Sequence, residues 1–330
     1  MHKQFLKYLV DPETKEDLRI ESTKEENNRI IEGFLISKSN KYPIVRGIPR
    51  FAGYKDDLNY TKSFGYQWNK WSLIQFDSKN IGKKYQGFSM DMLERITNIK
   101  DKNLNNAVIA DIGCGPGRFL ESIREKNGLA IGLDLSDAVE AAGEIYKDDP
   151  NVLICQADIL KSPLKTDSID GIFSIGVLHH TTNAEQGFKE MVRAVKPNGR
   201  ISVSVYSTGG YYDDFMVNIW RKIFKRFWPV TKHYPALIYT YIVVYLRTFI
   251  KKIPIIRTLA HPFFWFLPAL ILKDISWSIL NTFDSITPSN QYGYTMYQTF
   301  QWFKMIIMEY QLINANKHHQ SGNLSKKINQ

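Results

Sequence analysis

Cysteine is very scarce in this chain of 330 residues, which has only Cys114 and Cys155. Two thiols exclude a disulfide framework and a zinc site with four thiolate ligands. The spacing of His, Asp and Glu also indicates no metal site, so we expect no bound metal. Because the two thiols cannot form a disulfide scaffold, a reducing compartment fits best, and we expect a cytoplasmic protein.

Long hydrophobic runs are absent as well. The longest uncharged stretches cover residues 233–246 and 258–272. Both are shorter than the roughly 20 residues that a membrane-spanning helix needs. The N-terminus carries Lys3 and Lys7 but only short apolar runs, so no signal peptide is expected. These absences predict a chain without a transmembrane anchor.

Acidic residues are missing from one segment, because residues 215–273 contain neither Asp nor Glu. The same segment holds ten basic residues, which equal the net charge of +10 of the whole chain. They are Arg221, Lys222, Lys225, Arg226, Lys232, Arg247, Lys251, Lys252, Arg257 and Lys273. Since the rest of the chain is nearly neutral, any electrostatic partner is expected to bind this segment.

Composition and the positions of proline and glycine divide the chain into six parts. Residues 1–53 form a small Pro- and Gly-punctuated β module, 54–103 a linker with a helical lid, and 104–214 a core. Residues 215–280 form a basic aromatic helical insertion, 281–316 return to the core, and 317–330 are a polar tail. The insertion therefore separates two parts of one predicted core.

The core alternates short β-branched runs with helical stretches. We predict strands at 107–111, 130–134, 152–156, 171–175 and 201–206, and helices at 118–126, 137–146 and 184–195. This alternation is typical of βαβ units, so the sequence predicts an α/β fold with a doubly wound, Rossmann-like parallel sheet.

A glycine-rich turn follows the first predicted strand, with the sequence Asp111-Ile-Gly-Cys-Gly-Pro-Gly117. Its glycines allow the backbone to turn sharply and to approach a ligand without a Cβ in the way. The second strand ends at Asp134, where a carboxylate can accept hydrogen bonds from two ribose hydroxyls. Asp158 follows the third strand and can bond the amino group of adenine. These acids predict a nucleoside site at one edge of the sheet.

The glycine spacing separates two classes of nucleoside cofactor. A dinucleotide fingerprint, G-x-G-x-x-G, would place a glycine at position 118, where this chain has Arg118. A carboxylate at Asp111 would repel a pyrophosphate but suits the ammonium group of S-adenosylmethionine. Both observations favour the sulfonium cofactor.

Five motifs in collinear order resemble class I S-adenosylmethionine-dependent methyltransferases of the ubiquinone-biosynthesis type. They are Asp111-Ile-Gly-Cys-Gly-Pro-Gly117, Gly132-Leu-Asp-Leu-Ser136, Gln156-Ala-Asp158, Phe173-Ser-Ile-Gly-Val-Leu-His-His180 and Val195-Lys-Pro-Asn-Gly199. The resemblance covers residues 104–206 and implies a seven-stranded sheet with S-adenosylmethionine as the cofactor. The residues that it implies at the cofactor are Asp111, Gly113, Cys114, Gly115, Gly117, Asp134, Leu135, Ala157, Asp158, Ile159 and Ser174.

Two segments before the core also resemble parts of known methyltransferases. Leu9-Val-Asp-Pro-Glu-Thr14 and Lys41-Tyr-Pro-Ile-Val-Arg-Gly-Ile-Pro49 resemble the Trm112-like zinc-ribbon module. Its thiolate positions fall near Asp11 and Thr14, and residues 1–53 contain no cysteine, so we expect a metal-free platform. Ser63-Phe-Gly-Tyr-Gln-Trp68 resembles a segment that folds over the cofactor, which implicates Tyr66 and Trp68. Packing in the core is the alternative for these aromatic residues.

Candidate groups for the acceptor side follow the fourth and fifth strands. If the acceptor loses a proton on methylation, a histidine suits that task at neutral pH. His179 and His180 follow the fourth strand and are the candidate catalytic residues. Tyr206, Tyr211 and Tyr212 follow the fifth strand and are candidates for binding the substrate. Helix capping and packing are the alternative roles for the histidines.

The insertion begins with an amphipathic pattern over residues 215–228, in which basic residues lie beside Trp and Phe. This pattern is typical of helices that rest on anionic lipid. It also fits a helical cap packed on its own domain or on a second subunit, and basic residues among aromatics can bind RNA.

We expect methyl transfer to a small-molecule or lipid-like acceptor. An RNA methyltransferase of the ribosomal-RNA type and a non-catalytic binder of S-adenosylmethionine remain alternatives.

Overall fold

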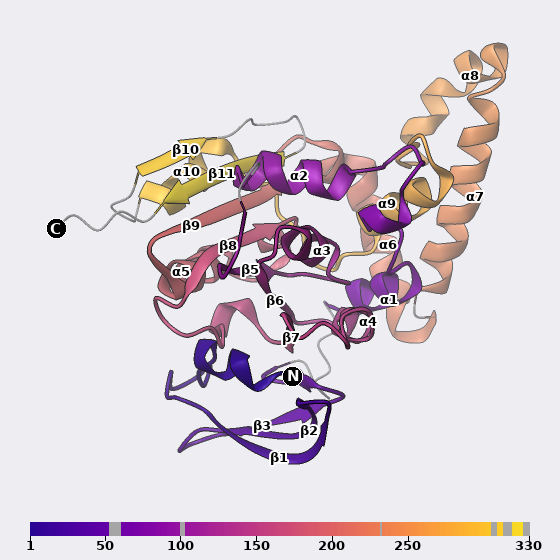
Figure 1. Ribbon diagram of the computed structural model, residues 1–330. Helices are drawn as coiled ribbons and strands as arrows, with labels where there is room; N and C mark the ends of the chain where they lie inside the picture. The colour runs from indigo at the N-terminus through magenta and orange to yellow at the C-terminus, as the bar shows by residue number, and fades with distance from the viewer. Residues whose placement is uncertain (53–60, 100–102, 232, 305–308, 313–318, 326–330) are drawn as a thin grey trace.

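The computed structural model describes residues 1–330 except for 53–60, 100–102, 232, 305–308, 313–318 and 326–330. Its strands form a four-stranded sheet near the N-terminus and a seven-stranded sheet in the core (Figure 1). Helices cover both faces of the larger sheet, and a group of long helices extends to one side of it.

The seven-stranded sheet has the strand order β10-β11-β9-β8-β5-β6-β7. Its five parallel strands are β5 (Val108–Ile112), β6 (Leu129–Asp134), β7 (Val152–Gln156), β8 (Ile169–Ile175) and β9 (Val195–Tyr206). Strand β11 (His319–Ser325) is antiparallel to β9, and β10 (Glu309–Leu312) is antiparallel to β11. This confirms the predicted doubly wound, seven-stranded α/β fold, whose order reverses at β5.

Strand β11 occupies residues 319–325 of the segment that the sequence assigns to a polar tail. Its sequence, HQSGNLS, has no alternation of apolar and polar residues, and so it carries no strand signal of its own. Its hydrogen-bonded register with β9 makes it a strand. A long-range partner therefore overrides the local pattern here.

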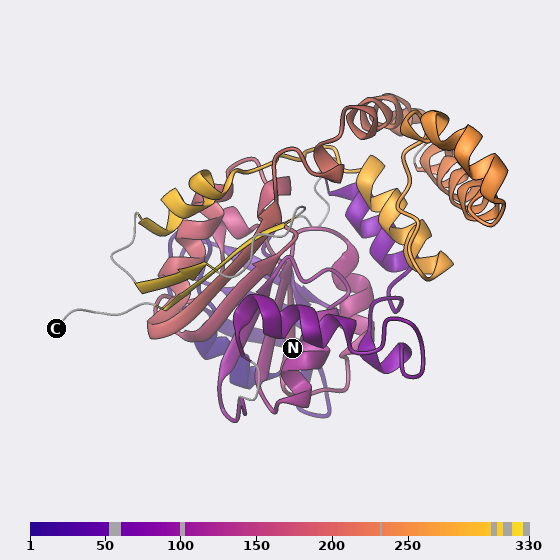
Figure 2. The same cartoon turned by 90° about the horizontal axis from the view of Figure 1, so that it is seen from above.

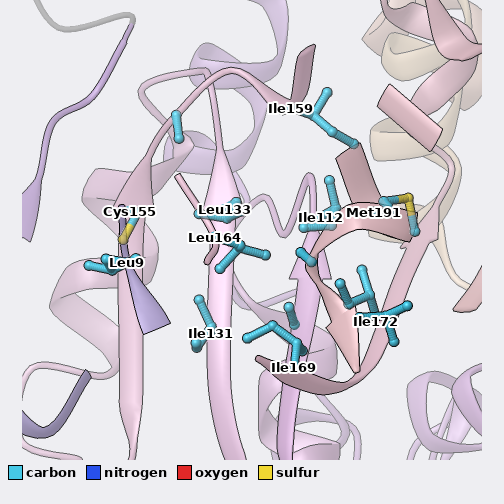
Figure 3. Packing of buried hydrophobic residues seen from close by; sticks show 14 of the residues in the cluster. Leu9, Ile112, Ile131, Leu133, Cys155, Ile159, Leu164, Ile169, Ile172 and Met191 are labelled. Carbon is cyan, nitrogen blue, oxygen red and sulfur yellow. The ribbon is translucent and has the colours of Figure 1, made fainter. Parts of the chain in front are cut away.

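Alternate residues of the central strands face two different hydrophobic layers. Val108, Ala110 and Ile112 of β5 belong to one cluster, and Ile109 belongs to the other. Helices α2 (Phe88–Thr97), α3 (Arg118–Glu125) and α4 (Ala138–Ile145) pack on the Ile109 side. Helices α5 (Ala184–Ala194) and α10 (Met296–Lys304) pack on the opposite side, and Figure 3 shows that layer from close by.

The N-terminal module is an antiparallel sheet docked on the core. Its strands are β1 (Arg19–Glu26), β2 (Arg29–Ile36), β3 (Lys41–Val45) and β4 (Ile48–Pro49). Arg50 crosses the junction: one guanidinium nitrogen donates to Oε1 of Gln156 at 3.0 Å, and another pairs with Glu140 at 2.9 Å. Apolar side chains of the module join the core layer that includes α5. The module therefore shares the core of the larger sheet.

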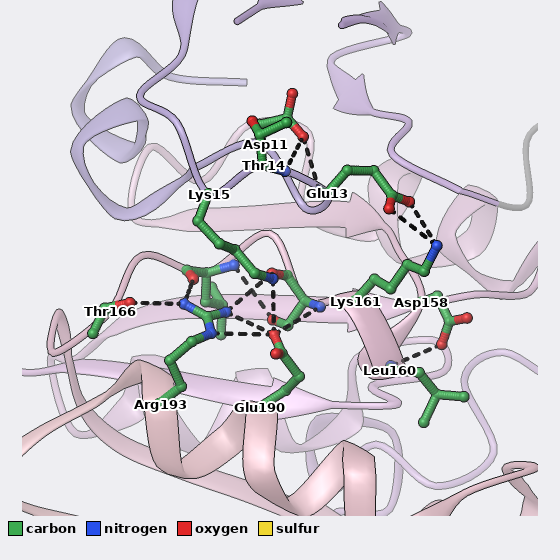
Figure 4. Close-up of polar contacts among 12 residues, drawn as sticks. Asp11, Glu13, Thr14, Lys15, Asp158, Leu160, Lys161, Thr166, Glu190 and Arg193 are labelled. Atoms are coloured by element: carbon green, nitrogen blue, oxygen red, sulfur yellow. Dashed lines mark hydrogen bonds and ion pairs between the residues drawn. The ribbon is translucent and has the colours of Figure 1, made fainter. Parts of the chain in front are cut away.

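Asp11 organises the loop that would carry the first thiolates of a zinc ribbon. Its carboxylate accepts hydrogen bonds from Ser37 at 2.5 Å, Asn40 at 2.9 Å and Tyr42 at 2.9 Å, and from the backbone N–H groups of Glu13 and Thr14. Burial acts to raise its pKa, but these hydrogen bonds outweigh it and hold the pKa well below the usual range. Figure 4 shows this loop above the ion pairs of the module with the core. A network of hydrogen bonds thus holds the loop together.

The insertion is helical. Helix α6 (Phe215–Thr231) contains the predicted amphipathic segment, and it is followed by α7 (Tyr234–Ile250), α8 (Pro254–Ala260) and η6 (His261–Trp265). Helix α9 (Ile275–Ile286) returns beside α1 (Lys62–Lys70). We call residues 234–266 the arm, because α7 and α8 project beyond the sheet in both views (Figures 1 and 2). Among the described residues, we find no helix whose length and hydropathy would let it cross a membrane.

Candidate functional site

A cleft of about 520 Å³ lies at the carboxyl ends of β5, β6, β7 and β8. One part of its lining consists of residues that end or follow these strands, and we call it the strand-end half. Its positions are 112–116, 118, 119, 133–136, 157–160, 175–177, 180 and 181. The other part comes from residues 61–92 and 206–284, on α1, α2 and α9 and on the segments next to them, and we call it the helical half. Parallel strands end at one edge, so turns that are far apart in sequence meet there.

The turn after β5 has a backbone that only glycine adopts without strain. The φ angles of Gly113, Gly115 and Gly117 are 77°, 54° and 91°. A Cβ on Gly113 would overlap the side chain of Val177, and a Cβ on Gly115 would lie 3.2 Å from the indole nitrogen of Trp68. Gly113 and Gly115 line the cleft, whereas Gly117 begins α3 behind it. The backbone of this turn can therefore approach a ligand closely.

Asp134 lines the cleft and is fixed by three hydrogen bonds. Its Oδ2 accepts the N–H of Gly115 at 2.8 Å, and its Oδ1 accepts the N–H and the hydroxyl of Ser136 at 2.8 and 2.7 Å. Burial raises the pKa of Asp134, and the bonds from Ser136 and Gly115 oppose this rise. Each carboxylate oxygen keeps the capacity to accept a hydroxyl from a ligand.

Asp111 lies behind the turn and does not line the cleft. It is 2% exposed, and its Oδ2 has no hydrogen-bond donor among the described residues. Burial raises the pKa of Asp111 to about 8, although the charge of Arg118 opposes the rise. A buried carboxyl with an unpaired oxygen destabilises the protein unless a donor or a cation reaches it.

The turn after β7 supplies Ala157, Asp158 and Ile159 to the lining. Oδ1 of Asp158 accepts the N–H of Leu160 at 2.9 Å, and burial raises the pKa of Asp158. Leu135, which follows Asp134, also lines the cleft and adds an apolar surface beside these residues. An aromatic ring would find both apolar contacts and a hydrogen-bond acceptor at this end.

Two further residues of the predicted cofactor set differ in position. Cys114 lines the cleft, and burial raises the pKa of its thiol well above the usual value, so the thiol stays protonated. Ser174 does not line the cleft, and its hydroxyl donates to the carbonyl of Ile112 at 3.0 Å. Ser174 thereby ties β8 to β5 beneath the glycine turn.

The structure separates the two candidate histidines. His180 lines the cleft, and its Nδ1 lies 2.8 Å from the carbonyl oxygen of Asn290. Because a carbonyl only accepts, Nδ1 carries the proton and Nε2 keeps a lone pair. Burial lowers the pKa of His180 to about 4, so the ring is neutral at pH 7. His179 is fully buried and packs against Tyr206 with ring centroids 3.8 Å apart and tilted ring planes, outside the lining.

All three predicted tyrosines line the cleft in its helical half. The rings of Tyr206 and Tyr212 stack with centroids 4.1 Å apart, and Tyr211 meets Tyr212 edge-on at 5.5 Å. Burial raises the pKa of Tyr206, and it raises that of Tyr211 to about 12, so both hydroxyls stay protonated at neutral pH. These rings offer an acceptor flat apolar surfaces with hydroxyl groups at their edges.

Asp284 is a lining residue that is not among the candidate site residues from the sequence. Its Oδ1 accepts the side-chain N–H of Gln67 at 2.8 Å, its Oδ2 lies 3.5 Å from the hydroxyl of Tyr206, and burial raises its pKa. Asn281 lines the cleft one turn earlier on α9. Their i, i+3 spacing puts both on one face of the helix. That spacing is the sequence signal that could have found them.

Helix α1 separates the two predicted lid aromatics. Trp68 lines the cleft beside Gly115. Tyr66 lies outside the lining, with its ring centroid 5.1 Å from that of His233 and 5.8 Å from that of Phe283. Phe64, one turn before Trp68, lines the cleft and meets the ring of His180 at 4.8 Å.

Residues 110–203 match the methyltransferase domain family. The chain contains a class I methyltransferase domain. The match includes the glycine turn, Asp134, Asp158 and both histidines, and the cofactor of such domains is S-adenosylmethionine.

Individual relatives match only in part. The mouse protein named Probable tRNA methyltransferase 9B is 32% identical over 105 residues, which are 31% of this chain and 22% of that protein. The ubiquinone biosynthesis O-methyltransferase of Rickettsia akari is 25% identical over 114 residues, which are 34% of this chain and 45% of that protein. This chain thus spans less than half the length of either relative.

A solved S-adenosylmethionine-dependent methyltransferase from Methanococcus maripaludis is 14% identical, with a TM-score of 0.43. The alignment covers 84% of this chain and 98% of that chain.

The cleft of the methyltransferase domain fits its cofactor in three respects. Gly113 and Gly115 present their backbone on the lining, Asp134 presents fixed acceptor oxygens, and Asp111 has a buried oxygen without a hydrogen-bond donor behind the turn. The nucleoside, the ribose hydroxyls and the cationic amino acid end of S-adenosylmethionine match these features in kind.

Proposed function

We propose that the protein transfers a methyl group from S-adenosylmethionine to a small-molecule or lipid-like acceptor. The observation that supports this best is the position of His180, a neutral histidine on the lining of the same cleft as the glycine turn and Asp134. A site that only stored the cofactor would need no proton acceptor beside it. We place this activity in the cytoplasm, where thiols such as Cys114 remain reduced.

The strand-end half would hold the cofactor. Asp134 would accept hydrogen bonds from the ribose hydroxyls, and Asp158 would accept one from the amino group of adenine. Leu135 and Ile159 would contact the faces of the adenine ring, next to Ala157. Gly113, Cys114 and Gly115 would present the backbone of the turn, with Gly117 and Ser174 holding its shape from behind. Asp111, behind the turn, would be neutral in the free protein because burial raises its pKa to about 8, and the ammonium group of the cofactor would favour its ionised form.

When bound, S-adenosylmethionine supplies an electrophilic methyl group that transfers by in-line displacement. The residues of this chain align the acceptor, exclude water and accept a proton. His180 would remove the proton of an acceptor hydroxyl or ammonium through Nε2, because the carbonyl of Asn290 fixes the proton on Nδ1. His179 would act as a positioning residue, since its ring packs between His180 and Tyr206.

The helical half would receive the acceptor. Tyr206, Tyr211 and Tyr212 provide aromatic faces, and Asp284 provides a half-buried acceptor oxygen. An acceptor with an apolar body and one or two polar groups suits this mixture. Trp68 and Phe64 of α1 would cover the junction of the two halves, whereas Tyr66 would hold α1 against α9.

RNA is the second candidate acceptor. Proteins named as tRNA methyltransferases resemble residues of this domain at 28–32% identity. The N-terminal module also supports this alternative, if it is a metal-free version of the Trm112-like platform. The similarity of this chain to a ubiquinone biosynthesis O-methyltransferase supports the small-molecule acceptor instead.

Two measurements test the proposal. Calorimetry with S-adenosylmethionine and S-adenosylhomocysteine should show binding of both compounds. Methyl-labelled cofactor should then label a lipid or small-molecule extract more than a pool of transfer and ribosomal RNA. Asp134→Ala serves as the matched variant with weakened cofactor binding and should label either extract less. Labelling of RNA alone would support the second candidate, and binding without any acceptor-dependent release of S-adenosylhomocysteine would leave a binding protein.

A further inference from the structure

The arm concentrates the exposed apolar surface of the molecule. In the described part of the chain, twenty large apolar side chains are exposed, and twelve of them lie on the arm, which is about a tenth of the residues. They are Tyr234, Ile238, Ile242, Tyr245, Leu246, Phe249, Ile255, Ile256, Leu259, Phe263, Trp265 and Phe266. Single exposed apolar residues are ordinary, but this many within one segment of the chain indicate an interaction surface.

Helix α7 has two apolar faces. Val243 and Val244 point inward and pack with Ala269 and Ile279, so one face joins the arm to the body. The exposed residues Ile238, Ile242, Tyr245 and Phe249 recur every three or four positions, and so they form one outward stripe. A helix that is apolar all round is normally buried on every side. The outer stripe of α7 therefore lacks a cover among the described residues.

The arm is fixed to the body rather than attached by a loose tether. The hydroxyl of Tyr239 donates to the carbonyl of Pro268 at 3.1 Å, and the indole of Trp220 donates to the carbonyl of Phe266 at 2.8 Å. Arg247 donates to the carbonyls of Leu267 and Ala269. These bonds tie the arm to α6 and to the segment that follows it, and the packing of Val243 and Val244 with Ile279 joins α7 to α9.

The charge around the stripe has one sign. Residues 215–273 contain no acid, and Lys251 and Lys252 are exposed at the end of α7. On the neighbouring α6, Lys222, Lys225 and Arg226 are exposed too. A second copy of this chain would bring the same positive segment against the first, and the two would repel each other. An apolar surface that carries negative charge complements the stripe in both respects.

We propose that the arm docks on an anionic lipid surface, with α7 lying in the plane of the interface. The stripe would enter the boundary between headgroups and acyl chains, while the lysines would reach the lipid phosphates. Helix α7 has 17 residues and so a length of about 26 Å, which suits a helix that lies on a bilayer. The proposal does not depend on methyl transfer.

Docking in this orientation would bring the cleft near the lipid. Leu270 and Leu272 follow the arm directly, and both line the cleft. Trp277 of α9, which also lines it, stacks on Tyr85 with centroids 4.2 Å apart. The segment that leaves the arm thus forms part of the helical half, the side where the acceptor would bind.

Co-sedimentation of the full chain with vesicles tests the proposal. We expect at least tenfold stronger association with vesicles of phosphatidylglycerol and phosphatidylcholine than with phosphatidylcholine alone, and a loss of this preference at high salt. The variant Ile238→Ser/Ile242→Ser/Phe249→Ser should bind at least tenfold more weakly. Its matched control is Leu73→Ser/Ile81→Ser/Tyr297→Ser, which removes three exposed apolar residues elsewhere and should bind like the wild type.

A second pair of variants tests the charge. Lys251→Glu/Lys252→Glu should lower binding to the anionic vesicles at least tenfold, whereas Lys38→Glu/Lys79→Glu changes the net charge equally, away from the arm, and should lower it less than threefold. Circular dichroism and calorimetry with S-adenosylmethionine show that each variant is folded. Equal binding of the apolar variant and its control would overturn the proposal. So would a dimer, seen by ultracentrifugation, that the apolar variant dissociates.

Discussion

The two halves of the cleft are built in different ways. The strand-end half uses turns within residues 112–181, which main-chain groups hold in place, as in the bond from the N–H of Gly115 to Asp134. The helical half joins residues that are up to about 220 positions apart, and side chains hold it together, as in the bond from Gln67 to Asp284. The main chain determines the shape of the strand-end half, so few substitutions should be tolerated there. Side chains determine the shape of the helical half, so substitutions can change it.

This difference indicates how each half should respond to mutation. Changes that add a Cβ or remove an anchoring carboxylate should damage the strand-end half, because its backbone cannot shift independently of the sheet. Changes in the helical half should alter the acceptor that the enzyme binds while leaving cofactor affinity intact.

Gly113→Ala should damage the strand-end half most. Gly113 and Gly176 have nearly equal φ angles of 77° and 76°, but only Gly113 has a neighbour, Val177, where its Cβ would go. Gly176→Ala should therefore lower the free energy of unfolding by about 1–2 kcal/mol, the cost of the left-handed backbone. Gly113→Ala should lower it by about 2–5 kcal/mol, because overpacking is added. Urea unfolding of the ligand-free protein measures both, and equal losses would mean that Val177 moves aside.

His180→Ala should lower kcat by about 100- to 1,000-fold, because it removes the proposed proton acceptor. The Kd for S-adenosylmethionine should stay within twofold of the wild type. Phe64→Leu is the matched control, since it touches the ring of His180 without proton chemistry. With a pKa of about 4, the ring is neutral from pH 6 to pH 8, so kcat should be flat there and fall only near pH 5 and below. An unchanged kcat in His180→Ala would contradict the role of base.

Asp134→Ala should weaken the binding of S-adenosylmethionine about 10- to 100-fold, the usual effect of losing one or two hydrogen bonds to a charged group. Asp137→Ala removes an exposed carboxylate three residues later and should leave the affinity unchanged. Calorimetry measures both variants. Similar losses in the two would show that general negative charge, rather than the fixed carboxylate, determines affinity.

Asp284→Asn should raise the KM for the acceptor about tenfold, because a neutral amide replaces a carboxylate as the partner of a polar acceptor group. Cofactor affinity should not change. If Asp284→Asn weakens the binding of the cofactor and leaves that of the acceptor unchanged, Asp284 contributes to the cofactor site. The two halves would then not have separate roles.

Asp111→Asn should alter the pH dependence of stability by about 1 kcal/mol per pH unit between pH 5 and pH 7. The folded protein raises the pKa of Asp111 to about 8 from an ordinary value of 3.8, so it binds more protons than the unfolded chain in that window. Stability of the wild type should therefore fall as pH rises, and the variant should lose that part of the slope. Unfolding curves at three pH values measure the difference. Equal slopes would mean that Asp111 is ionised in the folded protein.

Much of the strand-end half could be predicted from the sequence because its signals are local. The strand ending at Asp111, the three glycines and the carboxylates at Asp134 and Asp158 all lie within a few residues of the pattern that reveals them. The predicted strands match β5 to β9, apart from shifts at their ends. The helical half gave weaker signals, since Gln67 and Asp284 belong to helices whose packing is not encoded nearby.

Sequence alone determined the periodicity, the turn chemistry and the distribution of charge, because each depends on neighbouring residues. Tertiary structure decided which of two adjacent histidines reaches the cleft, since successive side chains point in different directions and only the surrounding sheet fixes those directions. It also decided that residues 319–325 form a strand, through pairing with β9. The apolar residues of α7 were visible in the sequence, but only the packing of one face against α9 showed that the other face is left exposed.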